Sequence, residues 1–177
     1  MFLDLARKRR SIRRYSDRPV EPEKLDILIE AALRSPSSIG RTPWEFIVVR
    51  DPALLDHLSR SKQHGSSFLK YASAAIVVCA DPAKSDVWVE DASIACIMIL
   101  LAAESLGLGG CWVQIRERSH SGSKTAEAYV REVLSIPEGL KVQAMMSIGY
   151  PDAPKEPRPR EELPFDKVHK DRYGNGY

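Results

Sequence analysis

The segment from Val87 to Leu106 restricts the possible folds of this chain more than any other, because it predicts a long helix that is apolar around most of its circumference. Its longest unbroken apolar run, Ile94 to Ala103, covers about half of the roughly 20 residues needed to cross a bilayer, so we expect a buried helix and no membrane span. Gly107 and Gly109 are suited to end it. Such a helix needs cover on every side, either from a sheet and helices of the same chain or from a second subunit, and the pattern leaves both open.

The segments on either side of this helix predict a layered domain of strands and helices. Amphipathic spacing or a proline-led start predicts helices over 22–34, 52–60 and about 122–134. Aliphatic, β-branched and aromatic composition predicts strands over 44–49, 74–80, 111–115 and 143–148. The strand at 74–80, "AAIVVCA", is apolar throughout, which indicates a central position with both faces covered.

The composition excludes several classes of protein. With 177 residues, 44% of them hydrophobic and 28% charged, the chain has enough apolar material for one globular domain. Its 26 basic and 24 acidic residues leave a net charge of +2, which is too small for a general nucleic-acid binder. Cys79, Cys96 and Cys111 are odd in number and lie far apart in apolar segments, so we expect no disulfides, no metal site and a reducing, cytoplasmic location.

The composition changes at Pro151. Residues 151–177 carry five of the twelve prolines, which rules out regular structure over most of this length. We therefore expect one domain over residues 1–150, followed by a Pro-rich C-terminal arm over 151–177 that is either extended or disordered.

Positive charge is concentrated at the N-terminus, in "RKRRSIRR" from Arg7 to Arg14. Six basic side chains in eight positions predict an anionic ligand, because the rest of the chain is nearly balanced in charge. A solvated surface is the ordinary alternative. A nucleic-acid-binding arm is a remote one, since no aromatic residues are interleaved with the basic ones.

Four segments, taken in order, resemble the FMN-dependent nitroreductase family over essentially the whole chain. They are "RRSIRRY" (9–15), "SPSSIGRTPWEFIVV" (35–49), "LGLGGCWVQI" (106–115) and "GYPDAPKEPRPR" (149–160). The resemblance implies an α+β nitroreductase-like fold with a mostly antiparallel sheet flanked by helices. It also implies that residues 1–150 form a flavin-binding domain, that the arm contributes to this domain or to the dimer, and that a homodimer binds FMN at its interface.

The resemblance assigns most of the basic run to the cofactor. Bidentate guanidinium groups suit a phosphate with nearly two negative charges. The residues implied at the FMN phosphate are Arg9, Ser11, Arg158 and Arg160, with Arg10 adjacent. Arg13 is implied at the pyrimidine end of the flavin ring, where its charge favours the reduced flavin.

Two loops are implied at the flavin ring. Pro36, Ser37, Ser38 and Gly40 are placed against the ring across the dimer interface, and the main-chain N–H groups of Gln114 and Ile115 against its N5 and O4 edge. Gly40 and Thr42 replace the Asn and Gln that are usual in the family, so one side-chain hydrogen bond to the ring is missing and Arg41 is a possible substitute. His64 and Ser66 are further candidates for contact with flavin or substrate. His57, His64 and His169 lack the spacing of metal ligands.

The implied activity is a ping-pong cycle in which NADH or NADPH reduces FMN and a nitroaromatic, quinone or similar small acceptor then reoxidises it. The flavin carries this chemistry, so no catalytic side chain is expected. No GxGxxG or Walker loop occurs, which argues against a separate dinucleotide site. The change at Gly40 and Thr42 leaves dehalogenation or flavin storage on the same fold as alternatives.

Overall fold

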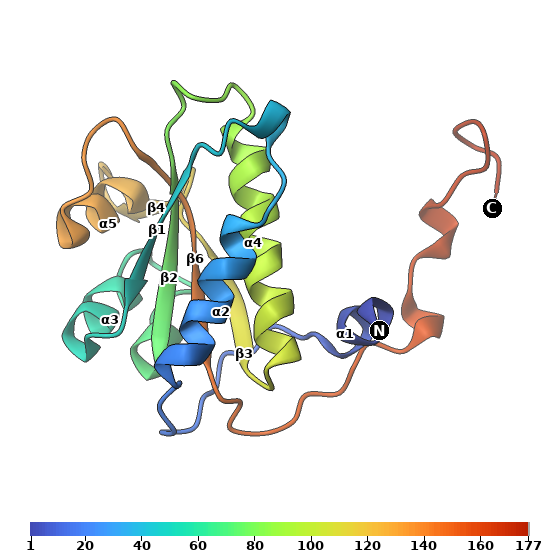
Figure 1. The fold of residues 1–177 in the computed structure, drawn as a ribbon, viewed down its shortest axis with the longest axis horizontal. Coiled ribbons are helices and arrows are strands. Elements are labelled where there is room, and N and C mark those ends of the chain that lie inside the picture. The colour runs from blue at the N-terminus through green and yellow to red at the C-terminus, as the bar shows by residue number, and fades with distance from the viewer. Residues whose placement is uncertain (177) are drawn as a thin grey trace.

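The protein is described over residues 1–176 by a computed structural model, whose centre is a four-stranded antiparallel sheet with helices on both faces (Figure 1). Its strands follow the order β1 (Trp44–Val49), β2 (Ala74–Ala80), β6 (Lys141–Gly149) and β3 (Gly109–Gln114). Every neighbouring pair is antiparallel. The expected α+β fold with an antiparallel sheet is confirmed.

Two helices cover one face of the sheet, α2 (Pro22–Leu33) and α4 (Trp88–Ser105), which pack side by side (Figure 1). Pro22 occupies the first turn of α2, where its missing N–H costs nothing. The other face is covered by α3 (Pro52–Ser59), the 3₁₀ turn η2 (Ser67–Tyr71) and α5 (Ala126–Leu134). β2 therefore lies between two apolar layers and is buried at all its positions, as its sequence predicts.

Cover for α4 from the same chain is present on one side of the helix, and cover by a second subunit stays a prediction. The sheet and α2 bury one side of the helix, including Ala95, Ile99 and Ala103. Ile94 and Ile97 remain 36% and 41% exposed. A single chain therefore leaves an apolar stripe on α4 uncovered. None of the described helices has the length and apolar character required to cross a membrane.

Some element boundaries differ from the sequence prediction. The helix expected from about residue 122 begins at Ala126, because a short hairpin of β4 (Ser119–Ser121) and β5 (Lys124–Thr125) precedes it. The Thr125 hydroxyl accepts a hydrogen bond from the Ala128 N–H and caps α5. A short helix that was not expected, α1 (Phe2–Lys8), lies at the N-terminus and buries none of its residues. It includes the first two residues of the basic motif, Arg7–Arg14.

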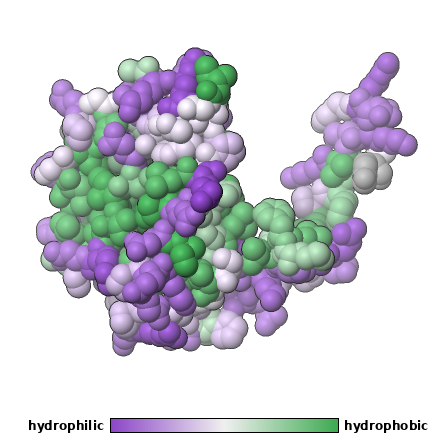
Figure 2. Space-filling view, in the orientation of Figure 1, coloured by the Kyte–Doolittle hydropathy of each residue, from purple (hydrophilic) through white to green (hydrophobic). Residues whose placement is uncertain are grey.

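The C-terminal arm is extended. Almost all of residues 152–176 are exposed, and their only helical segments are the short 3₁₀ turns η3 (Arg160–Glu162) and η4 (Phe165–Lys167). Figure 1 shows the arm passing α1 and then continuing away from the sheet and its helices. In Figure 2, hydrophobic residues gather over the face of the domain that carries β1, α2 and α4, and again around α1.

Candidate cofactor site

The N-terminal basic motif lies along the outer edge of β3. The Ile12 N–H donates to the Gly110 carbonyl at 3.0 Å, and Ser11 forms a parallel bridge with Gly110. The Ile12 side chain is buried against Gly109, where an added Cβ would lie 2.7 Å from Ile12 Cγ1. The glycine-rich start of β3 therefore allows the backbone of the motif to come close to the sheet.

Tyr15 anchors the other end of this motif. Its hydroxyl donates to the Ile12 carbonyl at 2.7 Å and lies 2.7 Å from Ser147 Oγ on β6. Burial raises the pKa of Tyr15 well above its ordinary value, so the phenol keeps its proton for these hydrogen bonds. The ring packs against Gly149, where a Cβ would lie 2.7 Å from Tyr15 Cδ1.

The start of the arm runs beside the same motif. The Ser16 N–H donates to the Tyr150 carbonyl at 3.0 Å, and the Asp152 N–H donates to the Arg14 carbonyl at 3.1 Å. Arg14 and Asp152 also form an ion pair at 3.0 Å. These contacts direct the following residues of the arm toward α1 (Figure 1).

Opposite ends of the chain consequently line one cavity of about 480 Å³. Its lining consists of Leu3, Ala6, Arg7, Arg9, Arg10, Arg158 and Leu163. The Arg10 guanidinium donates to the Glu156 carbonyl and so holds the arm beside the motif. Arg158 lies 3.7 Å from Glu162 at an exposed position. Among these lining residues the charges are all positive, which suits a multiply charged anion.

Not every residue predicted at the phosphate lies here. The Arg160 guanidinium stacks over the Phe165 ring at 4.8 Å and lines none of the cavities described. Ser11 lines a neighbouring cavity of about 330 Å³, together with Arg13 and Lys155. The Lys155 ammonium donates to the Ser11 carbonyl at 3.3 Å. Sequence reasoning missed Lys155, although its place within "APKEPRPR" was an available signal.

The cavities form a continuous series, since neighbouring ones share residues. Arg10 lines both the cavity of about 480 Å³ and a second one, which also contains Ile12 and Lys155. Arg13 links the cavity around Ser11 to another that contains Ser67 and Phe68. The Arg13 guanidinium lies 5.8 Å from the centroid of the Phe68 ring. The basic motif therefore follows an elongated cleft.

The two predicted amide donors at the end of β3 face opposite ways. The Ile115 N–H donates to the Gln143 carbonyl at 3.3 Å, toward β6. Main-chain groups alternate along an antiparallel strand, and the Gly110 carbonyl already points to the outer edge to meet Ile12. Gln114, four residues later, therefore points its N–H to the same outer edge. Of the two amides, only that of Gln114 faces away from the sheet.

The loop containing Pro36 to Gly40 is held by a buried carboxylate. Asp91 Oδ1 accepts the Ser38 N–H and Asp91 Oδ2 accepts the Ser85 hydroxyl, both at 2.8 Å. Ile39, Gly40 and Thr42 have φ angles of 42°, 73° and 45°. No sequence signal singled out Asp91, because it is one of three acidic residues in a helix that is otherwise largely apolar.

Other polar contacts complete this loop. The Ser37 hydroxyl accepts the Thr42 N–H at 2.9 Å. Arg41 forms an ion pair with Asp86 at 2.8 Å, so its guanidinium is engaged within the chain. Pro36 is exposed. Nothing in this arrangement brings the loop near the basic motif of the same chain.

The loop and the basic motif lie at opposite ends of α4. Ser38 contacts Asp91 in the first turns of the helix, whereas Ser11 and Ile12 bind Gly110, just beyond its last turn. A helix of 18 residues is about 27 Å long at 1.5 Å per residue. Within one chain, therefore, the loop and the basic motif lie about one length of α4 apart, although residues of both are predicted at the flavin ring.

Ser66 and His64 differ in their surroundings. The Ser66 hydroxyl is buried and donates to the Ser59 carbonyl at 2.8 Å, which gives it a structural role. His64 is exposed and lines a cavity with Lys62, Ser67 and His120.

The three cysteines are buried and free, and burial raises the pKa of each thiol, so all three stay protonated at neutral pH.

Comparison with known proteins identifies the family. The sequence pattern described as "Nitroreductase family" matches residues 6–150. A relative from Archaeoglobus fulgidus, whose name covers NADH dehydrogenase and NAD(P)H nitroreductase, is 40% identical over 93% of this chain and 94% of its own length. The solved structure of an FMN-dependent nitroreductase from Clostridium difficile R20291 is 46% identical, covers 97% of this chain and 99% of its own, and superposes with a TM-score of 0.95.

A more distant relative carries a different name. An iodotyrosine deiodinase from Thermotoga neapolitana is 25% identical over 92% of this chain and 95% of its own length. The match of the family pattern extends over the basic motif, the Pro36–Gly40 loop and the whole sheet. The chain belongs to the Nitroreductase family.

Proposed function

We propose that the protein is an FMN-dependent oxidoreductase that passes reducing equivalents from NADH or NADPH to a small organic acceptor, such as a nitroaromatic or a quinone. The observation that carries this proposal is the cavity in which Arg9, Arg10 and Arg158 converge from opposite ends of the chain. A terminal phosphate with nearly two negative charges fits a set of guanidinium donors without a lining carboxylate. The names of the nitroreductase relatives support the same cofactor and donors.

The remaining cleft suits the rest of a flavin mononucleotide. Ser11 and Lys155 lie where a ribityl chain would leave the phosphate, and Arg13 lies further along the cleft, beside Phe68. The Gln114 N–H points to the outer edge of β3 and is the main-chain donor that this chain offers to the ring. Bound FMN supplies the hydride-transfer chemistry, and the protein residues bind it, orient it and set the charge around it. Donor and acceptor then use the same open face in turn.

We also propose that two copies of the chain form the working unit. The loop at Pro36–Gly40 lies about one α4 length from the basic motif of its own chain, so a second copy is needed to complete the ring site. The uncovered stripe of Ile94 and Ile97 and the extended arm are the surfaces on which this copy would pack. On this proposal, the C-terminal arm forms part of the dimer interface. The protein is expected in the cytoplasm, with no nucleic-acid or membrane partner.

Reductive dehalogenation is a second candidate, favoured by the match to the Thermotoga neapolitana deiodinase. It uses the same cofactor site and differs in the acceptor. Turnover of a halogenated phenol, compared with that of a nitroaromatic and a quinone, separates the two functions.

The cofactor assignment is tested by binding. The purified protein should show a flavin absorption spectrum, and added FMN should raise the melting temperature of apoprotein. Arg9→Gln and Arg158→Gln should each weaken FMN binding about tenfold or more, because each loses a charge-assisted hydrogen bond. Arg172→Gln, an exposed arginine further along the arm, is the matched control.

The reaction is tested by anaerobic mixing with NADH or NADPH, which should bleach the flavin absorbance. A colourless protein whose melting temperature does not respond to FMN would rule out the cofactor. A flavin-loaded protein that neither nicotinamide reduces would instead indicate flavin storage.

A further inference from the structure

A second group of cations lines a cavity of about 390 Å³ that continues the cofactor cleft. Its lining consists of Ser59, Arg60, Lys62, Gln63, His64, Gly65, Ser67 and His120. All of these residues are polar or glycine, and none of these lining residues is a carboxylate. Ser67 also lines the cavity that contains Arg13 and Phe68, so the two cavities are neighbours.

His120 is held in one orientation at this cavity. Its Nδ1 lies 3.0 Å from the Arg60 carbonyl oxygen and 3.3 Å from that of Ser61. Carbonyl oxygens only accept hydrogen bonds, so Nδ1 carries a proton and Nε2 is the nitrogen left for a ligand. The imidazole stacks on the Tyr129 ring, with centroids 4.1 Å apart and planes 19° apart.

An acidic residue that interacts electrostatically with this imidazole is already paired. The carboxylate of Glu132 on α5 receives the Lys124 ammonium, and the charge of His120 makes only a small further contribution to lowering the Glu132 pKa. Arg60 is likewise paired, with Asp56 at 2.9 Å. The charged group available to bind a ligand at this cavity is therefore the ammonium of Lys62. The imidazole of His120 lines the same cavity.

Lys62 has the properties expected of an anion-binding residue. Within residues 1–176, the ion pairs do not include Lys62. Its ammonium is half-buried, and burial, followed by the positive charge of Arg118, lowers its pKa. A bound anion would relieve both effects, because it replaces lost hydration and offsets the repulsion.

Lys62 also interacts electrostatically with β3. Burial raises the pKa of Cys111 on β3, and the charges of Arg13, Lys155 and Lys62 all oppose that rise. The positive charge of Lys62 therefore acts on the same residue of β3 as the charges of the basic motif and the arm.

We propose that this cavity binds an anionic group, a phosphate or a carboxylate, on the molecule that reacts at the flavin, and that Lys62 and His120 are the residues that select for it. This inference rests on the proposed function. Two sources carry such a group within reach of the cleft: the extra phosphate that distinguishes NADPH from NADH, and a carboxylate on the acceptor. Charge-assisted hydrogen bonds from Lys62 Nζ and His120 Nε2 would hold either one.

Direct binding of inorganic phosphate tests the site without any turnover. Phosphate should shift the NMR signals of the His120 ring in a saturable way and leave those of His169 in the arm unchanged. Lys62→Gln should weaken this binding about tenfold, the loss expected for a hydrogen bond to a charged group. A His120 signal that ignores phosphate, or that responds equally in Lys62→Gln, would overturn the proposal.

Paired substrates identify the source of the anion. The pairs are NADPH with NADH, and 4-nitrobenzoate with 4-nitrotoluene. In one of the pairs, Lys62→Gln should raise KM about tenfold for the charged member only, with kcat unchanged, and Lys62→Arg should restore much of the loss. Lys141→Gln is the matched control, since Lys141 lies at the start of β6 and lines none of the cavities described.

These experiments distinguish failure of the anion-site proposal from failure of the proposed function. Lack of preference for the charged member of both pairs in the unsubstituted protein would overturn the proposal. If neither nicotinamide reduces the protein, the oxidoreductase assignment fails, and the phosphate titration of His120 still decides whether the anion site exists.

Discussion

Gly109 and Gly149 face each other across β3 and β6, and each makes room for one side chain of the basic motif. Ile12 fills the space above Gly109, and the Tyr15 ring fills the space beside Gly149. The arginines of the motif are exposed or half-exposed, so their positions depend on these two buried neighbours. At the scale of single residues, the position of the basic motif thus depends on two glycines that lie outside it.

Gly109→Ala should displace the motif. The added Cβ would lie 2.7 Å from Ile12 Cγ1, 2.8 Å from its Cβ and 2.9 Å from its Cγ2, and Ile12 is β-branched and cannot swing away. Overpacking of this kind costs about 1–3 kcal/mol of stability. We expect weaker FMN binding, measured by fluorescence titration, together with a lower melting temperature. Gly139→Ala meets nothing within 4 Å and serves as the control.

Tyr15→Phe should keep the ring and lose the hydroxyl that joins the motif to β6. The Ile12 carbonyl and Ser147 Oγ would each lose a buried partner, at a cost of about 1–3 kcal/mol. Urea unfolding measures the loss of stability, and FMN titration measures the effect on the motif. Unchanged FMN affinity in a destabilised but folded variant would show that the packed ring alone positions the arginines.

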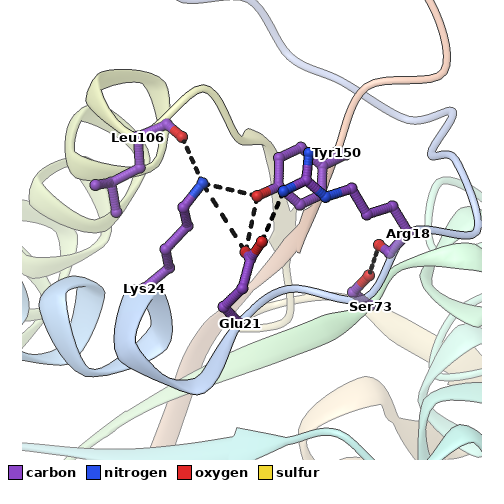
Figure 3. Close-up of polar contacts among 6 residues, drawn as sticks. All are labelled: Arg18, Glu21, Lys24, Ser73, Leu106 and Tyr150. Carbon is purple, nitrogen blue, oxygen red and sulfur yellow. Dashed lines mark hydrogen bonds and ion pairs between the residues drawn. The ribbon is translucent and has the colours of Figure 1, made fainter.

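At the scale of elements, a polar network joins the start of α2, the end of α4 and the end of β6 (Figure 3). The Tyr150 hydroxyl donates to Glu21 at 2.7 Å and accepts from the Lys24 ammonium at 2.7 Å. Lys24 also donates to the Leu106 carbonyl at 3.1 Å, which satisfies a group left unpaired at the end of α4. Arg18 donates to Glu21 at 2.7 Å and stacks over the Tyr150 ring at 3.9 Å. This network holds β6 at the point where the arm begins.

Glu21→Gln should show how this network depends on pH. The backbone N–H of Glu21, the Tyr150 hydroxyl and the Arg18 guanidinium lower the pKa of this carboxyl from 4.5 to about 2. Because the folded-state value is depressed, the stabilisation is complete above pH 4.5 and is lost as the pH falls through about 2. The variant should therefore be less stable than the unsubstituted protein at pH 7, and the difference should shrink between pH 4.5 and 2.

Urea unfolding at several pH values measures this difference. Asp26→Asn, an exposed acid on the same helix, is the control and should show little change. A gap between Glu21→Gln and the unsubstituted protein that stays constant down to pH 2 would contradict the assigned role of the carboxylate.

At the scale of the whole molecule, the residues that the proposed function assigns to FMN lie in two separate regions of one chain. The residues assigned to the phosphate lie where the N-terminus, β3 and the arm meet, while Asp91 holds the Pro36–Gly40 loop at the far end of α4. Four exposed apolar residues, Ile27 and Leu33 on α2 and Ile94 and Ile97 on α4, lie on the two helices that pack side by side over one face of the sheet. A second copy that covers this face would bring its own loop toward the first copy's cleft.

Ile97→Asp should weaken this association. It places a charge in the uncovered stripe of α4, where burial by a second copy would strip its hydration. Light scattering coupled to size exclusion should show a shift from dimer to monomer at low micromolar concentration, with loss of bound FMN. Ser105→Asp, at the exposed end of α4, should leave the mass unchanged. A monomeric unsubstituted protein with full FMN affinity would contradict the dimer proposal.

Local sequence patterns predict most of the helices and strands and the chemical character of the basic motif. The apolar, β-branched run of 74–80 favours a buried strand, and the spacing in 22–34 favours a helix with one apolar face, because both signals are local to the segment. The concentration of arginine at residues 7–14 likewise predicts an anion, since charge does not depend on the fold. The prolines after residue 150 likewise predict little regular structure, and the described part of this segment contains only short 3₁₀ turns as helical structure.

Which of these residues come together depends on the packing of the whole chain. Arg158 and Arg160 are two residues apart and equivalent in sequence, but Arg158 lines the cavity with Arg9, and Arg160 stacks on Phe165. Gln114 and Ile115 are adjacent, but strand alternation turns only the first amide outward. Asp91 and Lys62 gain their roles from burial and from neighbours distant in sequence. Long-range packing sets such contacts, and no local pattern records it.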